Sequence, residues 1–159
     1  MKVIMDADCL IKLTKAGLKE DICESFAIFI QRLVKEEVVD KGKSKDLPDA
    51  VVIEKNINAG RIKIRTDKTV QATEGEKEAL ALYQRGGFDA IGSDDKRFIR
   101  RMRLLNIPYV TPAVLIALMV KSGDLKASEA LKKLDALSPY VSDDEYYTIK
   151  LFLDQRRSR

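Results

Sequence analysis

Carboxylates recur where apolar segments of this chain end. The stretch "KVIMDADCLIKL" places Asp6 and Asp8 directly after a short apolar segment, residues 3–5, and before a second apolar segment. An unpaired carboxylate is very unfavourable to bury. These aspartates therefore either serve as ordinary turn and cap residues or hold something positively charged.

Three further acidic residues occupy comparable positions. Glu37 lies in "LVKEEVVD", Glu76 lies in "TEGEKEALALY", and Asp94 follows an apolar segment in "AIGSDDKRF". Each also has an ordinary explanation. Thr73 and Glu76 match a capping box, Glu37 suits a solvated helix surface, and Asp94 with Asp95 would complement a helix N-terminus.

Convergence of Asp6, Glu37, Glu76 and Asp94 would require a cation, because four carboxylates in one place repel one another. Mg²⁺ and Mn²⁺ prefer oxygen ligands and retain bound waters. Such an ion can lower the pKa of a water molecule and offset charge on a phosphoryl oxygen. We therefore expect a Mg²⁺ or Mn²⁺ site, with a phosphodiester as the natural substrate class.

The composition restricts the other possibilities. The chain has 159 residues, 45% hydrophobic and 34% charged, and 29 basic against 25 acidic residues give a net charge of +4. The absence of histidine excludes a His-ligated zinc site and a Ser-His triad. The two cysteines form no CxxC pair, and no apolar run is long enough to span a membrane. We expect a soluble protein without a membrane segment, in the reducing cytoplasm (a cytoplasmic location).

Segments that suit strands alternate with segments that suit helices. The expected strands cover residues 3–5, 27–30, 62–65, 89–92 and 108–110. The expected helices cover residues 9–16, 18–26, 31–40, 50–59, 74–84, 94–105, 112–123, 127–137 and 143–154. This order predicts an α/β fold in which helices flank a parallel sheet. Ligands of such folds bind beyond the carboxyl ends of the strands, which is where Asp6 lies.

At these acidic residues the chain resembles the PIN-domain family, metal-dependent nucleases that include the VapC toxins. The likeness begins with "VIMDADCLIKL" and continues through "LVKEEVVD", with Val34 and Glu37 at the matching places. "GEKEALALY" is similar to the GExEA segment of one subgroup, and "IGSDDKRFIRRMRLLNIPYVTP" is similar to a later strand and helix. The order and spacing of these segments carry the resemblance, since no single motif is specific.

The resemblance implies a single PIN-like domain over residues 1–159, with terminal helices from about 124–159 and a three-layer fold around about five parallel strands. It implies a metal site built from Asp6, Glu37, Glu76 and Asp94, and RNA cleavage through a metal-activated water that leaves a 5′-phosphate. It also suggests the toxin of a toxin–antitoxin pair, with a cognate antitoxin as partner. Position 76 carries Glu where many members have Asp, so Glu78 remains a rival for that role.

Basic residues follow the last of these acids. The segment "KRFIRRMR" contributes Lys96, Arg97, Arg100, Arg101 and Arg103. We expect Ser93, Lys96, Arg100 and Arg101 to hold the phosphate backbone of RNA beside the acids. A merely solvated basic face is the alternative, and the loop "KGKSK" is another basic segment.

Two rival functions stay open at this stage. A haloacid-dehalogenase-type phosphohydrolase also begins with Asp-x-Asp after an apolar strand, but it gives no role to Glu37 or Glu76. The other rival is a PIN-like module that binds RNA or protein without cutting. The segment "TPAVLIALMVKSG" is apolar on nearly every side, which leads us to expect a homodimer; a helix fully buried within the monomer is the alternative.

Overall fold

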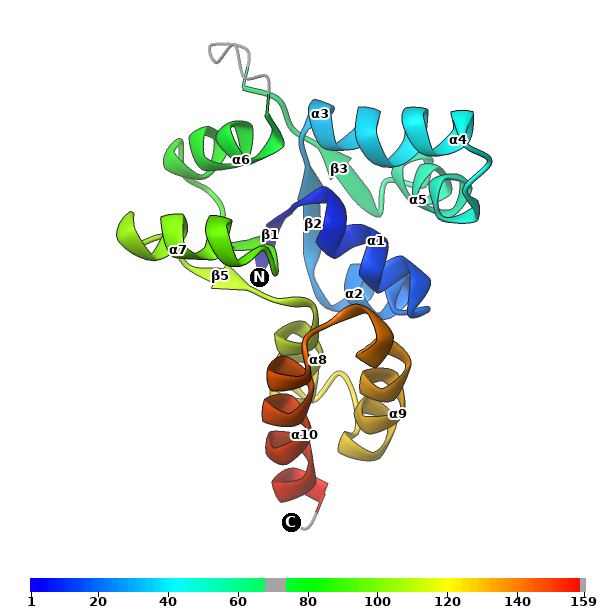
Figure 1. The fold of residues 1–159 in the computed structure, drawn as a ribbon, viewed down its shortest axis with the longest axis vertical. Coiled ribbons are helices and arrows are strands. Elements are labelled where there is room, and N and C mark those ends of the chain that lie inside the picture. Colours follow the sequence, from blue (N-terminus) through cyan, green and yellow to red (C-terminus); the bar gives the residue numbers. More distant parts are fainter. Residues whose placement is uncertain (68–73, 158–159) are drawn as a thin grey trace.

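A five-stranded parallel sheet forms the centre of the molecule (Figure 1). The computed structural model describes residues 1–67 and 74–157. The strands are β1 (Lys2–Met5), β2 (Ala27–Ile30), β3 (Ile62–Ile64), β4 (Ala90–Gly92) and β5 (Tyr109–Val110). Their order in the sheet is β3-β2-β1-β4-β5. The predicted α/β fold with a parallel sheet of five strands is therefore confirmed.

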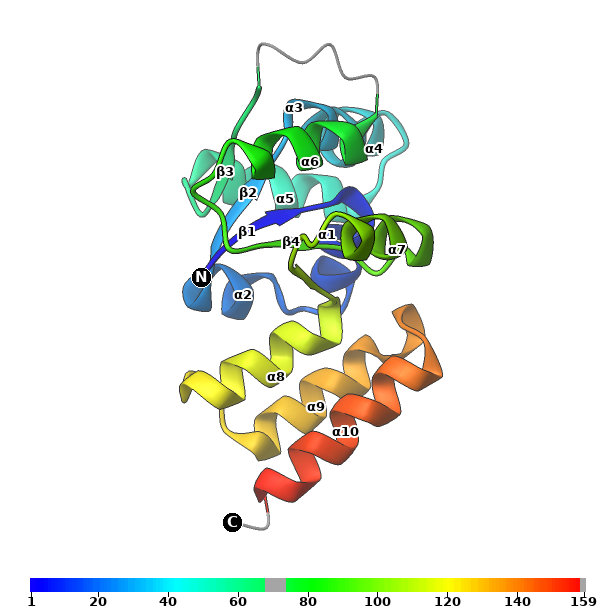
Figure 2. The same cartoon turned by 90° about the vertical axis from the view of Figure 1, so that its left-hand side faces the viewer.

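Helices cover both faces of this sheet, which gives the expected three layers (Figures 1 and 2). Successive side chains of a strand point to opposite faces. Ile4 packs in one apolar cluster with residues of α6 (Gly75–Gln84) and α7 (Lys96–Leu104). Its neighbours Val3 and Met5 pack in a larger cluster on the other side. The remaining helices before β4 are α1 (Ala7–Lys15), α2 (Lys19–Ser25), α3 (Arg32–Lys35), α4 (Gly42–Ser44) and α5 (Pro48–Asn58).

The C-terminal part forms a helical layer beside the sheet domain (Figure 2). It consists of α8 (Pro112–Ser122), α9 (Ala127–Leu137), a 3₁₀ turn η2 (Ser138–Tyr140) and α10 (Asp143–Arg157). Leu115, Ile116 and Met119 of α8 are buried in the larger apolar cluster, together with residues of α9 and α10. The apolar character of α8 is thus accounted for by burial within one chain. The observation that led us to expect a homodimer therefore no longer requires one.

Two local features differ from the sequence prediction. The helix expected over 31–40 is α3 followed by a π-helical turn, η1 (Glu36–Lys41), and such turns are frequent at functional sites. Helix α7 begins at Lys96, and Asp95 is its N-cap. Thr73 of the predicted capping box lies outside the described residues. Within the described ranges, no helix has both the length and the apolar character needed to cross a lipid bilayer.

Candidate active site

Asp6 stands at the junction of the central strand and the first helix. Its backbone N–H donates to the carbonyl of Gly92 at 2.9 Å, which fixes it beside the end of β4. Its Oδ1 atom accepts from the backbone N–H of Cys9 at 2.7 Å, so Asp6 caps α1. The Ser93 side chain also hydrogen-bonds to the Asp6 carboxylate. Asp6 therefore lies at the place where parallel sheets bind ligands, as the sequence predicts.

The surroundings of Asp6 disfavour its negative charge. Its pKa is raised from 3.8 to about 7, mainly by burial and in smaller part by the nearby charges of Asp94 and Asp8, while the hydrogen bonds from Ser93 and Cys9 act in the opposite direction. A carboxyl group that titrates near neutrality is poised to gain a cation, because a bound cation would stabilise the ionised form.

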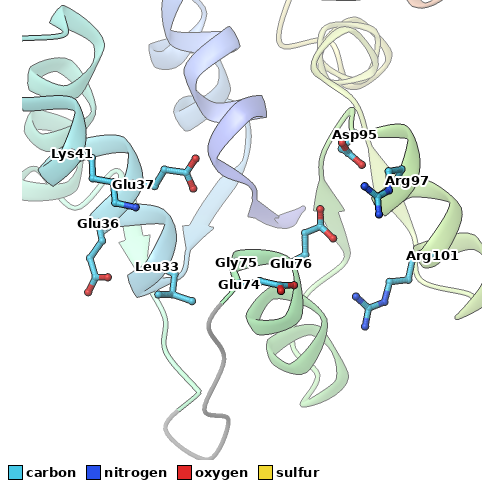
Figure 3. Close-up of a pocket in the computed structure, with 10 residues that line it drawn as sticks. All are labelled: Leu33, Glu36, Glu37, Lys41, Glu74, Gly75, Glu76, Asp95, Arg97 and Arg101. Atoms are coloured by element: carbon cyan, nitrogen blue, oxygen red, sulfur yellow. The ribbon is translucent and has the colours of Figure 1, made fainter. Parts of the chain in front are cut away.

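Carboxylates from four separate segments line a small cavity next to Asp6. The cavity measures about 280 Å³ and is lined by Asp6, Ala7, Asp8, Val34, Glu37, Gly75, Glu76 and Asp95. A larger cavity of about 630 Å³ has Glu37, Gly75, Glu76 and Asp95 in common with it. The larger cavity adds Leu33, Glu36, Lys41, Glu74, Arg97 and Arg101 (Figure 3). Three of the four predicted acids thus reach one hollow of the surface.

Glu37 and Glu76 face each other across this hollow from different layers. Glu37 is an exposed residue of the π-helical turn η1. Glu76 lies half-buried in the first turn of α6. Burial and the charge of Asp95 raise the pKa of Glu76, while Arg101 and Arg97 act in the opposite direction. Figure 3 shows the Glu76 carboxylate between the η1 side and the α7 side of the cavity.

The structure separates the neighbouring residues Asp94 and Asp95. Asp95 lines both cavities, and its Oδ1 atom accepts from the backbone N–H of Phe98 at 2.8 Å. Asp94 lines neither cavity. Its Oδ2 atom instead accepts from Lys12 Nζ at 2.6 Å. Sequence reasoning chose Asp94, whereas the side chain on the cavity wall is that of Asp95.

Glu78, the rival of Glu76, lies away from the cavity. It is 3% exposed and accepts a hydrogen bond from the backbone of Leu33 near the start of α3. Burial raises its pKa, against the opposing effect of that hydrogen bond. Its Oε2 atom is buried without a hydrogen-bond partner among the described residues. In this arrangement Glu78 links α6 to α3, and Glu76 is the glutamate that reaches the cavity.

The basic residues of α7 divide between two sides of the helix. Arg97 and Arg101 line the larger acidic cavity. Lys96 and Arg100 line a different groove of about 650 Å³, which also includes Glu145 of α10. The sequence prediction grouped Lys96, Arg100 and Arg101, and it did not single out Arg97. Residues four apart share a side of a helix, so Arg97 lies with Arg101 and Lys96 lies with Arg100.

Ser93 has a different setting from the RNA contact that we expected. It is fully buried, and its Oγ accepts from the backbone N–H of Asp95 at 3.2 Å. It also hydrogen-bonds to Asp6. Because its side chain reaches no surface, the structure gives it a positioning role between the two aspartates.

Comparison with family models gives one decisive result. A model described as PIN domain matches residues 2–154. The chain belongs to the PIN-domain family. PIN domains are generally nucleases, so this PIN domain is of the nuclease type. Comparisons with curated proteins and with solved structures gave no match.

The donor atoms of this PIN domain suit the divalent metals that PIN domains typically use. All the candidate ligands are carboxylate oxygens, the ligands that Mg²⁺ and Mn²⁺ prefer. The raised pKa of Asp6 also fits a bound cation, which would stabilise the ionised carboxylate. Among the described residues, however, no three acidic or cysteine side chains already lie close enough to hold a metal ion.

Proposed function

We propose that this PIN domain is a Mg²⁺- or Mn²⁺-dependent endoribonuclease that hydrolyses RNA phosphodiesters. The observation that carries the proposal is the cavity at the carboxyl end of β1. There Asp6, Glu37, Glu76 and Asp95 meet from four segments of the chain. The family supplies the nuclease class, and the all-oxygen donor set supplies the choice of metal.

Asp6, Glu37, Glu76 and Asp95 are the residues that would hold the ion. A bound divalent ion supplies a lowered pKa for an attacking water and offsets the charge on a phosphoryl oxygen. Ser93 keeps Asp6 and the backbone of Asp95 in place through its two hydrogen bonds. To hold the ion together, these side chains would have to come closer than they lie here, because the described acids do not form a metal-holding group.

Arg97 and Arg101 are the residues that would hold the RNA next to the acids. Both lie on the wall of the larger cavity, opposite the η1 side that carries Glu37 (Figure 3). Arginine binds phosphate in a two-pronged geometry. This contact would bring a phosphodiester to the carboxylates and would offset the repulsion between RNA and the acidic wall.

The test compares the neighbouring aspartates as a matched pair. Asp95→Asn is expected to lower Mn²⁺ affinity at least tenfold and to abolish most cleavage of a fluorescent single-stranded RNA. Asp94→Asn is expected to change Mn²⁺ affinity much less, because the Asp94 carboxylate already forms an ion pair with Lys12. Calorimetric Mn²⁺ titration and the cleavage rate are the two measurements. A wild-type chain that neither binds Mn²⁺ nor cuts RNA would refute the proposal.

A binding module without catalysis is the second candidate. It is favoured by the finding that the described acids do not form a ready metal-holding group. RNA binding without any heat of Mn²⁺ binding would support it. The haloacid-dehalogenase-type reading is less well supported, since it leaves the cavity residues Glu37 and Glu76 without a role; a trapped phosphoryl group on Asp6 would revive it.

The biological setting forms the remaining part of the proposal. The toxin role and the antitoxin partner rest on the sequence resemblance to VapC-like members, and the homodimer rests on the apolar segment over residues 111–123. The cytoplasmic location agrees with the free thiols of Cys9 and Cys23. A small neighbouring gene that encodes a DNA-binding segment and an amphipathic tail would support the toxin role. Sedimentation at micromolar concentration would decide between monomer and dimer.

A further inference from the structure

A lysine stands among the acids of the candidate site. Lys12 Nζ lies 2.7 Å from Asp8 Oδ2 and 2.6 Å from Asp94 Oδ2. The side chain of Lys12 is 22% exposed, and that of Asp94 is 10% exposed. Asp8 lines the smaller cavity together with Asp6. The ammonium group thus bridges the Asp8 carboxylate of the cavity wall and the largely covered carboxylate of Asp94.

The two carboxylates around the Lys12 ammonium are also the kind of ligands that hold a divalent metal ion. Mg²⁺ is commonly held by one or two carboxylates and several waters. Asp8 and Asp94 supply two such carboxylates, and Asp94 keeps a buried Oδ1 atom without a partner among the described residues. Some nucleases use two ions, placed about 3.5–4 Å apart. The Asp8–Asp94 pair therefore offers the donors of a second ion position.

We propose that the Lys12 ammonium takes the place of a second divalent ion, so that the site holds one ion and one lysine. The inference rests on the proposed metal-dependent function. In this arrangement Asp94 is the ion-pair partner of Lys12 and not a ligand of the first ion. This agrees with the placement of Asp95, and not Asp94, on the cavity wall. Lys12 is then a positioning residue that sets how many ions the site can hold.

The experiment counts bound Mn²⁺ ions in the absence of RNA. Electron paramagnetic resonance measures the free Mn²⁺ during a titration of the full chain. The wild type is expected to bind one ion, and Lys12→Gln is expected to bind two. The double variant Lys12→Gln with Asp94→Asn is expected to return to one ion, because it removes the donor that Lys12 had occupied.

Lys15→Gln is the matched control. It removes the same charge from the same helix, but Lys15 Nζ lies 4.0 Å from Asp49 and makes no ion pair with Asp8 or Asp94 among the described residues. This control is expected to bind one ion. Lys12→Met is a second variant, which keeps the packing of the lysine stem if Lys12→Gln does not fold.

The outcomes separate this inference from the proposed function. One ion in both Lys12 variants would overturn the role of Lys12, and so would two ions in the wild type or a second ion in Lys15→Gln. A wild type that binds no Mn²⁺ would refute the metal-dependent function itself, and with it the basis for assigning Lys12. Gain of the second ion only on loss of Lys12, reversed by Asp94→Asn, would establish the inference.

Discussion

The acidic cavity and the C-terminal helical layer use burial in opposite ways. In the helical layer, burial falls on apolar side chains: Leu115, Leu134 and Leu153 are each 0% exposed. At the cavity, burial falls on the carboxyl group of Asp6 and in part on that of Glu76; it raises the pKa of both, and the pKa of Asp6 reaches about 7. Burial therefore stabilises the first region, whereas in the second it disfavours the ionised form of Asp6. This contrast is the reason for proposing the cavity, and not the helical layer, as the site of the chemistry.

The largest expected effect is in the helical layer. Leu134→Ala should lower the free energy of unfolding by about 2–5 kcal/mol, because it leaves a cavity in a packed core. Mn²⁺ affinity of the folded fraction should not change, since the acids lie elsewhere. Leu151→Ala, on a side chain that is 62% exposed, is the control and should cost less than about 0.5 kcal/mol. Equal losses in urea unfolding would contradict the contrast between the two regions.

The second prediction concerns the change of folding stability with pH, which for Asp6 has the opposite sign to that of an ordinary aspartate. The folded pKa of Asp6, about 7, lies above its ordinary value of 3.8. The folded state therefore binds more protons than the unfolded state between these values, and the metal-free protein should lose up to about 4 kcal/mol of stability as pH rises from 4 to 7.5. Asp6→Asn cannot ionise and should be more stable than wild type at pH 7.5.

The measurement is metal-free thermal or urea unfolding at several pH values. Saturating Mn²⁺ should remove the pH-dependent loss in the wild type, because the ion stabilises the ionised carboxylate. It should not restore cleavage in Asp6→Asn. A wild type whose metal-free stability rises with pH over this window would show that Asp6 is ionised in the folded chain without help.

The third prediction separates the two glutamates of α6. Glu76→Gln should lower Mn²⁺ affinity about tenfold or more and leave stability nearly unchanged, because Glu76 is half-buried on the cavity wall. Glu78→Gln should lower stability by about 1 kcal/mol and leave Mn²⁺ affinity unchanged, because its buried carboxylate accepts from the Leu33 backbone. If Glu78→Gln abolished Mn²⁺ binding instead, the ligand assignment would have to be exchanged.

The fold could be predicted from the sequence because the apolar segments, and the Gly and Pro residues that separate them, indicate the order of strands and helices. Sequence reasoning reached Asp6 because the carboxyl end of a central parallel strand is a fixed place in such folds. It missed Asp95 as a cavity residue because the directions of two adjacent side chains depend on the residue at which the helix begins. The helix was expected from residue 94, but α7 begins at Lys96. The capping geometry of Asp95 three residues before Phe98 was the available signal.

The parts that could not be predicted depend on long-range packing. Lys12 and Asp94 are far apart in the chain, and only the pairing of β1 with β4 brings them together. The sequence analysis gave Lys12 no role, because its spacing of four residues from Asp8 is consistent with a local ion pair on one helix and indicates nothing more. Likewise, the sequence showed that α8 is apolar, but only the placement of α9 and α10 showed that it is covered within the chain.

The smallest expected effect concerns RNA binding by the two sides of α7, one of which faces the cavity and the other the helical layer. Arg101 lines the acidic cavity, whereas Arg100 lines the groove towards α10 of the helical layer. Each phosphate contact to a single strand contributes roughly 0.7 to the slope of log affinity against log salt. Arg101→Gln should therefore flatten that slope by roughly 0.7 for single-stranded RNA, and Arg100→Gln should leave it unchanged. RNA affinity is measured at several salt concentrations in Ca²⁺, which replaces Mn²⁺ so that cleavage does not interfere. A loss of slope in Arg100→Gln alone would place the RNA along the groove. No loss in either variant would leave Arg97 and Lys41 as the next basic residues of the cavity to test.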